Sequence, residues 1–350
     1  MLAYFWPNAA RAPRVFASHL VRDSVTRSYS QACACGHVCG ADSARAATCQ
    51  SPRLLRAYCS MARAAKPETE FDLGDPSPAR PAPANDAAPP AQLAGRYRVQ
   101  ALLGQGGMAS VYRAIDPISG RELAIKHAFS RADTREGREL CALFEREFHL
   151  LAQLSHPRVI EVYDYGIDDG RPYYTMELLD GGDLRELSPL PWQRVCALIY
   201  DVCSSIALLH SRRFVHRDIS PLNVRCTRAG YAKLIDFGAA APMGVAPHVV
   251  GTPAFIAPEA LSRGALDARA DLFSLGATAY YALTGQPPFE AQHLSELNAA
   301  WSLTPYRPSQ LVDDIPPALD ELVMSLISLD PAQRPRSTFE VMQRLSAIAE

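Results

Sequence analysis

The sequence contains very little lysine: of its 35 basic residues, only Lys66, Lys126 and Lys233 are lysines and the others are arginines. It also lacks any run of 18 apolar residues free of charge and proline, so no membrane-spanning helix is expected. With 350 residues and 48% hydrophobic content, the chain is long enough to bury a core. This composition excludes a collagen, a disulfide mini-protein and a wholly disordered chain.

Charged residues are unevenly placed along the chain. Residues 1–66 hold 9 basic and 2 acidic residues, whereas residues 67–350 hold 26 basic and 35 acidic ones. The larger part is therefore mildly acidic, which argues against nucleic acid as its main partner. We expect the two parts to be separate bodies.

Residues 1–66 are rich in Ala, Arg and Ser and show no sustained helical or strand period. We expect an unstructured extension, or a mis-assigned start that is not made because Met61 opens a shorter chain. Two alternatives stay open. Cys33, Cys35 and Cys39 could hold a metal, although their spacing fits no paired zinc motif. The Arg-rich, acid-poor composition also resembles an organelle transit peptide.

Residues 67–95 contain seven prolines among Ala, Asp and Ser, a composition that predicts an extended linker. Periodic sequence begins at about Arg96 and continues to residue 350. Its first part has short β-rich runs between glycine turns, and its later part has the apolar spacing of helices. We expect strands at 96–103, 110–116, 121–128, 159–165 and 173–179. We expect one helix that ends near residue 154 and a second that starts at residue 191. Further helices are expected at 271–283, 294–301, 319–329 and 337–349.

The first of these helices has apolar residues at three- and four-residue steps, so we expect one face of it to be buried. The predicted buried stripe consists of Leu140, Leu143, Phe144, Leu151 and Leu154. Glu147 lies on the same face, where an acidic residue needs a partner.

The first two predicted strands are joined by a turn containing Gly104, Gly106 and Gly107. Such a turn lets backbone N–H groups approach phosphate oxygens, although a glycine hairpin can also be a simple turn. The next strand carries Lys126 in an apolar run, where an ammonium requires a partner, and we expect that partner to be Glu147. The alternative is an edge-strand lysine that extends to solvent.

Two further strings carry acidic residues. The first is His-Arg-Asp218 followed by Asn223, and the second is Asp236-Phe-Gly beyond a predicted hairpin. An acid, an amide five residues later and a second acid could converge on the magnesium ions of a nucleotide, with one acid left to orient a hydroxyl. The order and spacing of all four strings disfavour a purely structural interpretation.

With these strings, residues 96–350 resemble a bacterial eukaryotic-like (Hanks-type) Ser/Thr protein kinase. The resemblance extends further along the chain. The end of the activation segment is matched by Gly251, Thr252, Ala257, Pro258 and Glu259, and the acid that anchors the catalytic loop by Asp271. Arg334 stands where the family has an arginine that pairs with the acid at the position of Glu259. It implies an α+β, two-lobed protein-kinase fold, with a small β-rich N-lobe at 96–179 and a larger α-helical C-lobe at 180–350.

The resemblance also implies ATP-dependent phosphorylation of Ser/Thr hydroxyls on protein substrates in signalling, with Mg²⁺ or, in its place, Mn²⁺. The implied catalytic residues are Asp218, Lys126, Glu147, Asn223 and Asp236, of which Asn223 and Asp236 bind the metal. The implied ATP-binding residues are Gly104, Gly106, Gly107, Val111, Ala124, Lys126, Met176, Glu177, Leu179 and Asp183. Met176 resembles a gatekeeper, Asp183 stands at the usual ribose contact, and Leu151, Val162, Phe237 and His216 resemble a stack that joins the lobes.

Three residues depart from the family pattern. Ala109 replaces the third glycine of the phosphate loop. Ser220 replaces a lysine that usually contacts the γ-phosphate and Asp218, although a hydroxyl could still orient that acid. Arg225 replaces an apolar residue under the adenine, which its aliphatic stem could cover. These departures keep a second hypothesis open, a pseudokinase scaffold or nucleotide-binding module with little or no transfer activity. A small-molecule kinase is a third.

Residues 239–250 contain no Ser, Thr or Tyr. Kinases with Arg217 beside the catalytic acid often order this segment by pairing the arginine with a phosphate. We therefore expect activity without phosphorylation in this stretch, and order supplied by apolar packing or by a regulatory protein. Because the kinase region ends the sequence, we expect signals to arrive through a separate partner or the N-terminal region.

Four cysteines fall within the expected kinase region, and each lies on a predicted helix or strand. They are Cys141, Cys196, Cys203 and Cys226. Such cysteines behave as small apolar residues, and unpaired thiols persist in a reducing compartment. We expect a cytoplasmic protein.

Overall fold

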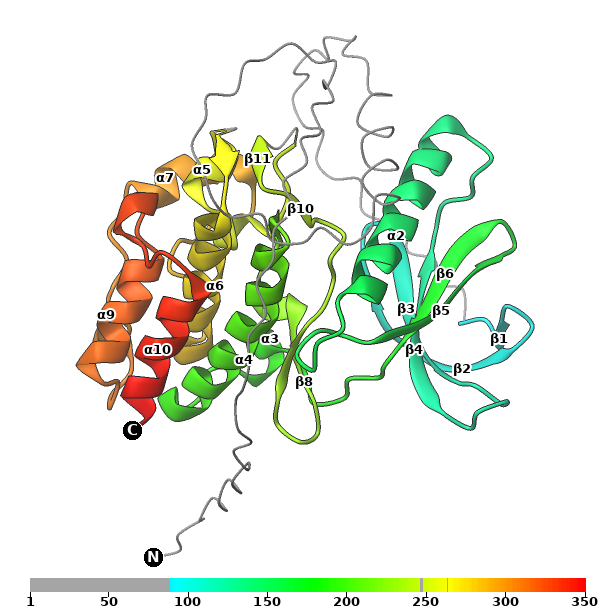
Figure 1. Cartoon of the computed structure of the whole chain (residues 1–350), viewed down its shortest axis with the longest axis horizontal. Helices are drawn as coiled ribbons and strands as arrows, with labels where there is room; N and C mark the ends of the chain where they lie inside the picture. Colours follow the sequence, from blue (N-terminus) through cyan, green and yellow to red (C-terminus); the bar gives the residue numbers. More distant parts are fainter. Residues whose placement is uncertain (1–88, 246–247, 263) are drawn as a thin grey trace, which may run out of the picture. The chain divides into compact units, whose positions relative to one another are not determined.

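The computed structural model describes residues 89–245, 248–262 and 264–350. The hypotheses on the extension at 1–66, including the metal, the transit peptide and the start at Met61, lie outside these residues, as does most of the linker predicted at 67–95. The described chain forms a sheet with one long helix, followed by a helical half (Figure 1). The expected α+β fold is therefore confirmed.

Six strands of the described chain form one antiparallel sheet in the order β1-β2-β3-β4-β6-β5. β1 lies upstream of residue 96, where periodic sequence was expected to begin, and extends the sheet by pairing Gln92 with Arg98. The bounds are β1 Gln92–Leu93, β2 Tyr97–Gln105, β3 Ala109–Ile115, β4 Glu122–Ala128, β5 Val162–Asp168 and β6 Arg171–Met176.

The helix α2, Arg135–Gln153, begins where the Thr134 hydroxyl accepts the N–H of Gly137. Its buried face includes Phe144, Glu147 and Leu151, which point toward β5 and β6. The prediction that Leu143 belongs to this face is wrong, because its side chain is 46% exposed. At about 100° per residue, Leu143 falls outside the arc that meets the sheet.

The second half of the described chain is mainly helical, as expected. Its helices are α3 Leu184–Leu187, α4 Trp192–Ser211, α5 Pro258–Leu261, α6 Ala268–Thr284, α7 Leu297–Trp301, α8 Pro308–Leu311, α9 Pro317–Leu326 and α10 Thr338–Ala349, with single 3₁₀ turns η1 Pro221–Asn223, η2 Pro253–Phe255, η3 Leu294–Glu296 and η4 Pro331–Gln333. Three short antiparallel pairs are β7 Phe214–Val215 with β10 Ala241–Pro242, β8 Val224–Cys226 with β9 Ala232–Leu234, and β11 Gly244–Val245 with β12 Ala265–Leu266.

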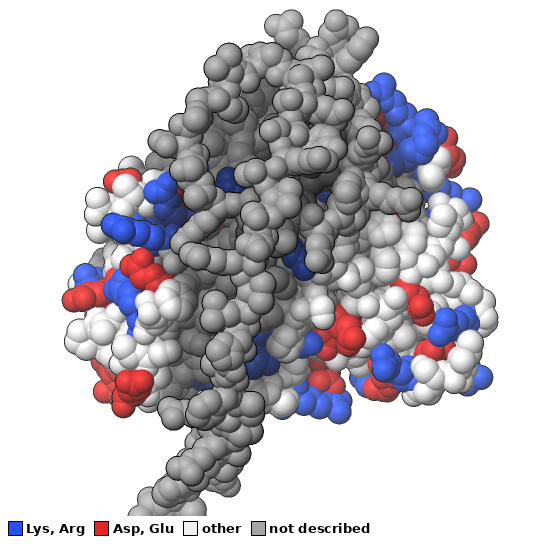
Figure 2. Space-filling model, in the orientation of Figure 1, with Lys and Arg blue, Asp and Glu red and all other residues white. Residues whose placement is uncertain are grey.

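On the visible described surface, basic and acidic side chains are interspersed (Figure 2). One described helix, α4, is long and apolar enough by length and composition to cross a membrane. Its Val202, Cys203 and Ile206 are fully buried inside the molecule. The core of the helical half therefore accounts for the apolar character of α4.

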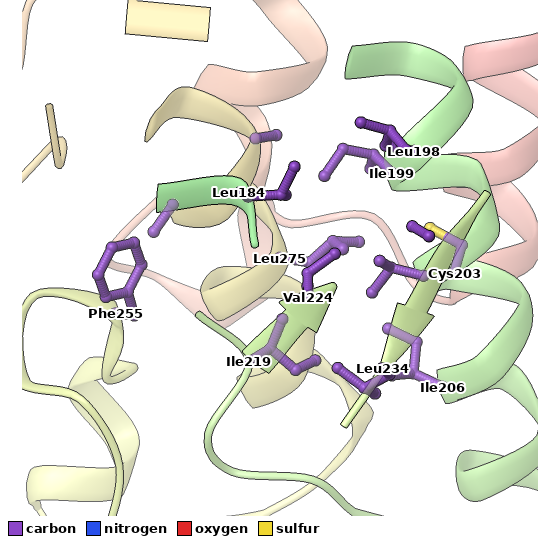
Figure 3. Close-up of a cluster of buried hydrophobic side chains, with 14 of the residues drawn as sticks. Leu184, Leu198, Ile199, Cys203, Ile206, Ile219, Val224, Leu234, Phe255 and Leu275 are labelled. Atoms are coloured by element: carbon purple, nitrogen blue, oxygen red, sulfur yellow. The ribbon is translucent and has the colours of Figure 1, made fainter. Parts of the chain in front are cut away.

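This core supports the loops that carry the candidate site. Cys203 and Ile206 of α4 gather with Val224 of β8, Leu234 of β9 and Ile219 of the loop between β7 and β8 (Figure 3). All five side chains are buried. Burying such side chains stabilises each by about 1.5–3 kcal/mol relative to exposure, so the core fixes the loop at its base.

Candidate active site

Lys126 of β4 and Glu147 of α2 form an ion pair. The Lys126 ammonium donates to both carboxylate oxygens of Glu147, at 2.8 and 2.9 Å, and the Tyr174 hydroxyl donates to Oε1 at 3.1 Å. Because β4 lies between β3 and β6, Lys126 is not on an edge strand. The alternative of a lysine that extends to solvent is therefore wrong.

A second carboxylate completes the surroundings of this lysine. Oδ1 of Asp236 lies 3.5 Å from the Lys126 ammonium. Burial opposes the charge on Lys126, but Tyr174 and Glu147 raise the pKa of its ammonium well above the usual value. Lys126 therefore stays cationic at neutral pH and presents a fixed positive charge to any anion in the site.

Asp271 of α6 holds the loop that carries Asp218. Its buried carboxylate accepts the backbone N–H groups of His216 and Arg217, at 2.8 and 2.9 Å. Arg217 has a φ of +69°, in the left-handed region that costs free energy for a non-glycine residue. The two bonds from Asp271 hold this backbone in place. The His216 ring meets Phe237 edge-on at a centroid distance of 4.7 Å, which is one contact of the expected four-residue stack.

The Asp218 carboxylate is held by two neighbours. Asn223 donates from Nδ2 to Oδ2 at 2.9 Å, and Thr252 donates from its backbone N–H and its hydroxyl to Oδ1, at 2.9 and 2.8 Å. Burial raises the pKa of Asp218 above its usual value, and the bonds from Thr252 act in the opposite direction. Both oxygens are thus fixed in direction. Oδ1 accepts both bonds from Thr252, whereas Oδ2 accepts one bond from Asn223 and retains a free lone pair.

Ser220 does not orient this acid. Its side chain is fully buried, and its hydroxyl has no hydrogen-bond partner among the residues described. The hydroxyl that orients Asp218 belongs instead to Thr252. From the sequence, Thr252 was assigned to the activation segment but not to this contact. Gly251 makes the approach possible: its φ is +120°, and a Cβ there would lie 2.6 Å from the carbonyl oxygen of Arg217.

The β8–β9 hairpin brings Asn223 and Asp236 together. Val224 pairs with Leu234 in the ladder, and the N–H of Ile235 donates to the carbonyl of Asn223 at 2.9 Å. The Asn223 amide oxygen and the Asp236 carboxylate, which is 45% exposed, are the hard oxygen ligands that Mg²⁺ prefers. No cluster of three or more His, Cys, Asp or Glu suited to a metal occurs in the described chain. Two protein ligands fit a cation that also binds substrate phosphates.

A mainly apolar cavity of about 140 Å³ opens beside this hairpin. It brings together six residues expected to bind the nucleotide, namely Gly104, Val111, Ala124, Met176, Glu177 and Leu179. It is also lined by Leu103, Ile160, Leu178, Arg225 and Ile235. Of these, Leu103, Ile160 and Ile235 were missed, although Ile235 directly precedes Asp236 and could have been placed from that position. Leu178 lies within the stretch from Glu177 to Leu179 whose backbone the resemblance assigns to adenine.

The side chains of Glu177 and Asp183, which were expected to bind the nucleotide, contact other groups of the protein. Glu177 accepts the N–H of Glu161 at 2.8 Å and pairs with Lys233, which leaves its backbone for a ligand. Asp183 is buried, and its Oδ1 caps α3 by accepting the N–H of Glu186 at 3.0 Å. Asp183 is not among the residues that line the cavity.

The glycines of the β2–β3 turn leave room for a ligand. A Cβ added at Gly104 or Gly107 would meet nothing within 4 Å, and at Gly106 only the Ala109 carbonyl at 3.9 Å. None of the three has a positive φ. The fold therefore requires no glycine here, whereas close approach of phosphate oxygens to the backbone does.

The segment after Asp236 is ordered by backbone contacts. β10 pairs with β7, and β11 pairs with β12. The Arg217 guanidinium donates from Nε to the carbonyl of Ala239 at 2.8 Å. Farther along, Arg334 donates to both carboxylate oxygens of Glu259, at 2.6 and 2.9 Å, as the resemblance implied.

The geometry described above defines a phosphoryl-transfer enzyme: a cationic lysine, a positioned carboxylate base, oxygen ligands for a cation and a mainly apolar cavity. Residues 97–345 match the family described as protein kinase domain. The chain therefore belongs to the protein kinase family.

Three of its relatives are bacterial serine/threonine-protein kinases. The chain is 36% identical over 272 residues to the serine/threonine-protein kinase PknL of Mycobacterium tuberculosis, covering 74% of this chain and 67% of PknL. It is 36% identical over 261 residues to the DNA damage-responsive serine/threonine-protein kinase RqkA of Deinococcus radiodurans, covering 70% of this chain and 38% of RqkA. To PknB of Mycobacterium leprae it is 32% identical over 269 residues, covering 72% of this chain and 43% of PknB. The expected bacterial eukaryotic-like kinase is confirmed, and the matches span two thirds of PknL but less than half of the other two.

Proposed function

We propose that this protein transfers the γ-phosphoryl group of ATP to Ser or Thr hydroxyls of protein substrates, with Mg²⁺ as the cation. The array of Lys126, Glu147, Asp236 and Asp218 is the observation that carries the proposal. The names of the bacterial relatives support Ser/Thr as the acceptor. ATP as donor is supported by the family and by the cavity next to the glycine turn.

In the transfer, the substrate hydroxyl oxygen forms a bond to the γ-phosphorus, and the bond from that phosphorus to the β–γ bridging oxygen breaks. Asp218 orients the hydroxyl and accepts its proton, because its carboxylate is held by Asn223 and Thr252. Lys126, oriented by Glu147, holds the α- and β-phosphates of the nucleotide. ADP leaves with the electron pair of the broken bond.

Asn223 and Asp236 would hold the divalent cation, since the hairpin places them side by side with oxygen atoms available. When bound, the cation neutralises charge on the phosphates. Mn²⁺ has the same preference for oxygen ligands and would serve in its place.

We place this activity in the cytoplasm, where ATP is available and thiols stay reduced. The four cysteines of the described chain are unbridged, and three of them are buried. We also propose that a regulatory protein binds the segment after Asp236 and helps to order it.

The test measures transfer of labelled phosphate from ATP to a generic protein substrate by the full chain. Asp218→Asn keeps the size of the side chain and removes the base, so we expect it to lose most of the activity. Equal signal from both proteins would overturn the proposal. Nucleotide binding without transfer by the unaltered chain would instead establish the pseudokinase alternative.

A further inference from the structure

Arg225 is one of two charged residues that line the cavity in the described part of the chain. The other charged residue of the lining, Glu177, is turned toward Lys233. Arg225 is 31% exposed. Its guanidinium carries five N–H donors, and none of them makes a hydrogen bond to any described residue.

The Arg225 guanidinium is nevertheless held in place. Its Nη1 lies 3.7 Å from Oδ2 of Asp183, close enough for an ion pair and too far for a hydrogen bond. The backbones of the two residues form an antiparallel bridge. Next to that bridge, the N–H of Cys226 donates to the carbonyl of Gly182 at 2.8 Å and the N–H of Gly181 donates to the carbonyl of Cys226 at 3.0 Å. The backbone at Arg225 is therefore held by these contacts, and its guanidinium faces one carboxylate.

The place of Arg225 along the chain sets which part of a ligand it meets. Asn223 ends the 3₁₀ turn η1 and Arg225 is the middle residue of β8, two residues further on, so the chain can separate them by no more than about 7 Å. Asn223 marks the phosphate end of the site, and the backbone of Glu177 to Leu179 marks the base end. Arg225 therefore lies beneath the part of a nucleotide that joins base to phosphates, which is the ribose.

We propose that Arg225 is a ribose-binding residue of this kinase, with its aliphatic stem under the base and its guanidinium donating to ribose hydroxyl oxygens. Asp183 acts through Arg225 as a positioning residue, because its own carboxylate is buried, caps α3 and faces the arginine. The proposal rests on the proposed function only in that the nucleotide occupies this cavity.

The experiment measures equilibrium binding of ADP, 2′-deoxy-ADP and 3′-deoxy-ADP to the full chain by titration calorimetry, so it requires no phosphate transfer. A hydrogen bond from a charged donor to a ribose hydroxyl corresponds to a factor of about 10 to 100 in affinity. We expect the unaltered chain to bind at least one of the deoxy nucleotides more weakly than ADP by such a factor.

Arg225→Leu keeps an apolar floor and removes the donors. We expect it to bind ADP and both deoxy nucleotides with equal affinity, close to that of the unaltered chain for the disfavoured deoxy nucleotide. The matched control is Arg228→Leu, which alters an exposed arginine outside the cavity lining and should keep the discrimination.

Discrimination that persists in Arg225→Leu, or its absence from the unaltered chain, overturns the proposal, as does a failure of ADP to bind. If Arg225→Leu loses the discrimination between ADP and the deoxy nucleotides but the unaltered chain transfers no phosphate, the ribose-binding role of Arg225 is supported and the proposed kinase activity is refuted. If the unaltered chain transfers phosphate but Arg225→Leu still discriminates, the kinase activity is supported and the ribose-binding role is refuted.

Discussion

Ser220 occupies a position where the family usually has a catalytic lysine, yet its hydroxyl is buried and contacts no polar group of the described chain. A buried hydroxyl without a partner costs about 1–3 kcal/mol, whereas a methyl group in its place costs little. We expect Ser220→Ala to leave the transfer rate unchanged and to raise the free energy of unfolding by up to about 1 kcal/mol. Steady-state kinetics and urea titration measure both, and a tenfold fall in kcat would contradict this expectation.

Thr252 opposes the effect of burial on the pKa of Asp218. Its hydroxyl donates to the ionised form of Asp218 at 2.8 Å and so opposes the rise in the Asp218 pKa that burial causes. Thr252→Val removes this bond and keeps the shape, so the pKa of Asp218 should rise further. Since only the carboxylate accepts the proton, activity should then be lost at a higher pH as the solution is acidified.

The measurement is the acid limb of kcat/KM against pH, which reports the free enzyme. Thr284→Val, which removes a hydroxyl at the end of α6 that bonds only local backbone, is the control. An acid limb that does not move, or moves to lower pH, would refute a role for Thr252 in holding Asp218.

Among single residues, those in short motifs were the most predictable. Lys126 pairs with Glu147, and Asn223 binds Asp218, because each motif occupies a fixed place on a strand, helix or loop. Asp183 was less predictable. Its carboxylate caps α3 through the N–H of Glu186, which is a local contact, but its pairing with Arg225 depends on a backbone bridge between residues far apart in sequence.

Among elements, the segment after Asp236 is held by contacts that need no phosphate. In kinases with an arginine at the position of Arg217, a phosphate bound to that arginine often orders this segment. Arg217, which would receive a phosphate, already donates to the carbonyl of Ala239. β10 and β11 pair with strands of the helical half. The contacts on the described part of this segment are therefore made without any added charge.

We expect the chain to have the same transfer rate before and after complete dephosphorylation by a phosphatase, because residues 239–250 offer no hydroxyl to modify. Rates measured on both samples, with phosphate content followed by mass spectrometry, check this. A fall of tenfold or more after dephosphorylation would show that a phosphate elsewhere orders the site.

The length of an element determined how well it could be predicted. α4 and α10 match their apolar spacing closely, since several turns reveal a period. β7, β10, β11 and β12 have two residues each and were not predicted, because such short strands show no period. For α2 the helical repeat of apolar residues was predicted correctly. The number of side chains that the sheet covers could not be predicted from that repeat, so Leu143 was expected to be buried but is exposed.

At the scale of the whole molecule, the site exists only while the sheet half and the helical half are packed together. Lys126 and Glu147 belong to the first half, and Asp218 and Asp236 to the second. The 3.5 Å approach of Asp236 to Lys126 joins them. Changes that loosen the helical half should therefore reduce activity without touching a catalytic group.

Arg334 offers the sharpest test of this dependence. Its guanidinium is fully buried and also donates to the carbonyls of Arg269, in the first turn of α6, and Ser328, each at 2.8 Å. Arg334→Met keeps the volume but leaves the Glu259 carboxylate without its partner. Removing one member of a buried pair costs about 3–5 kcal/mol, and urea unfolding should show a loss of that size.

The same substitution should lower kcat, because α6 carries Asp271, which holds the backbone of His216 and Arg217. Arg336→Met, two residues away and exposed, should change the free energy of unfolding by no more than about 0.5 kcal/mol and leave kcat as it is. If Arg334→Met unfolds at the same urea concentration as the unaltered chain, the buried pair does not hold the helical half together. The catalytic loop would then have to be supported by the core beneath Ile219 alone.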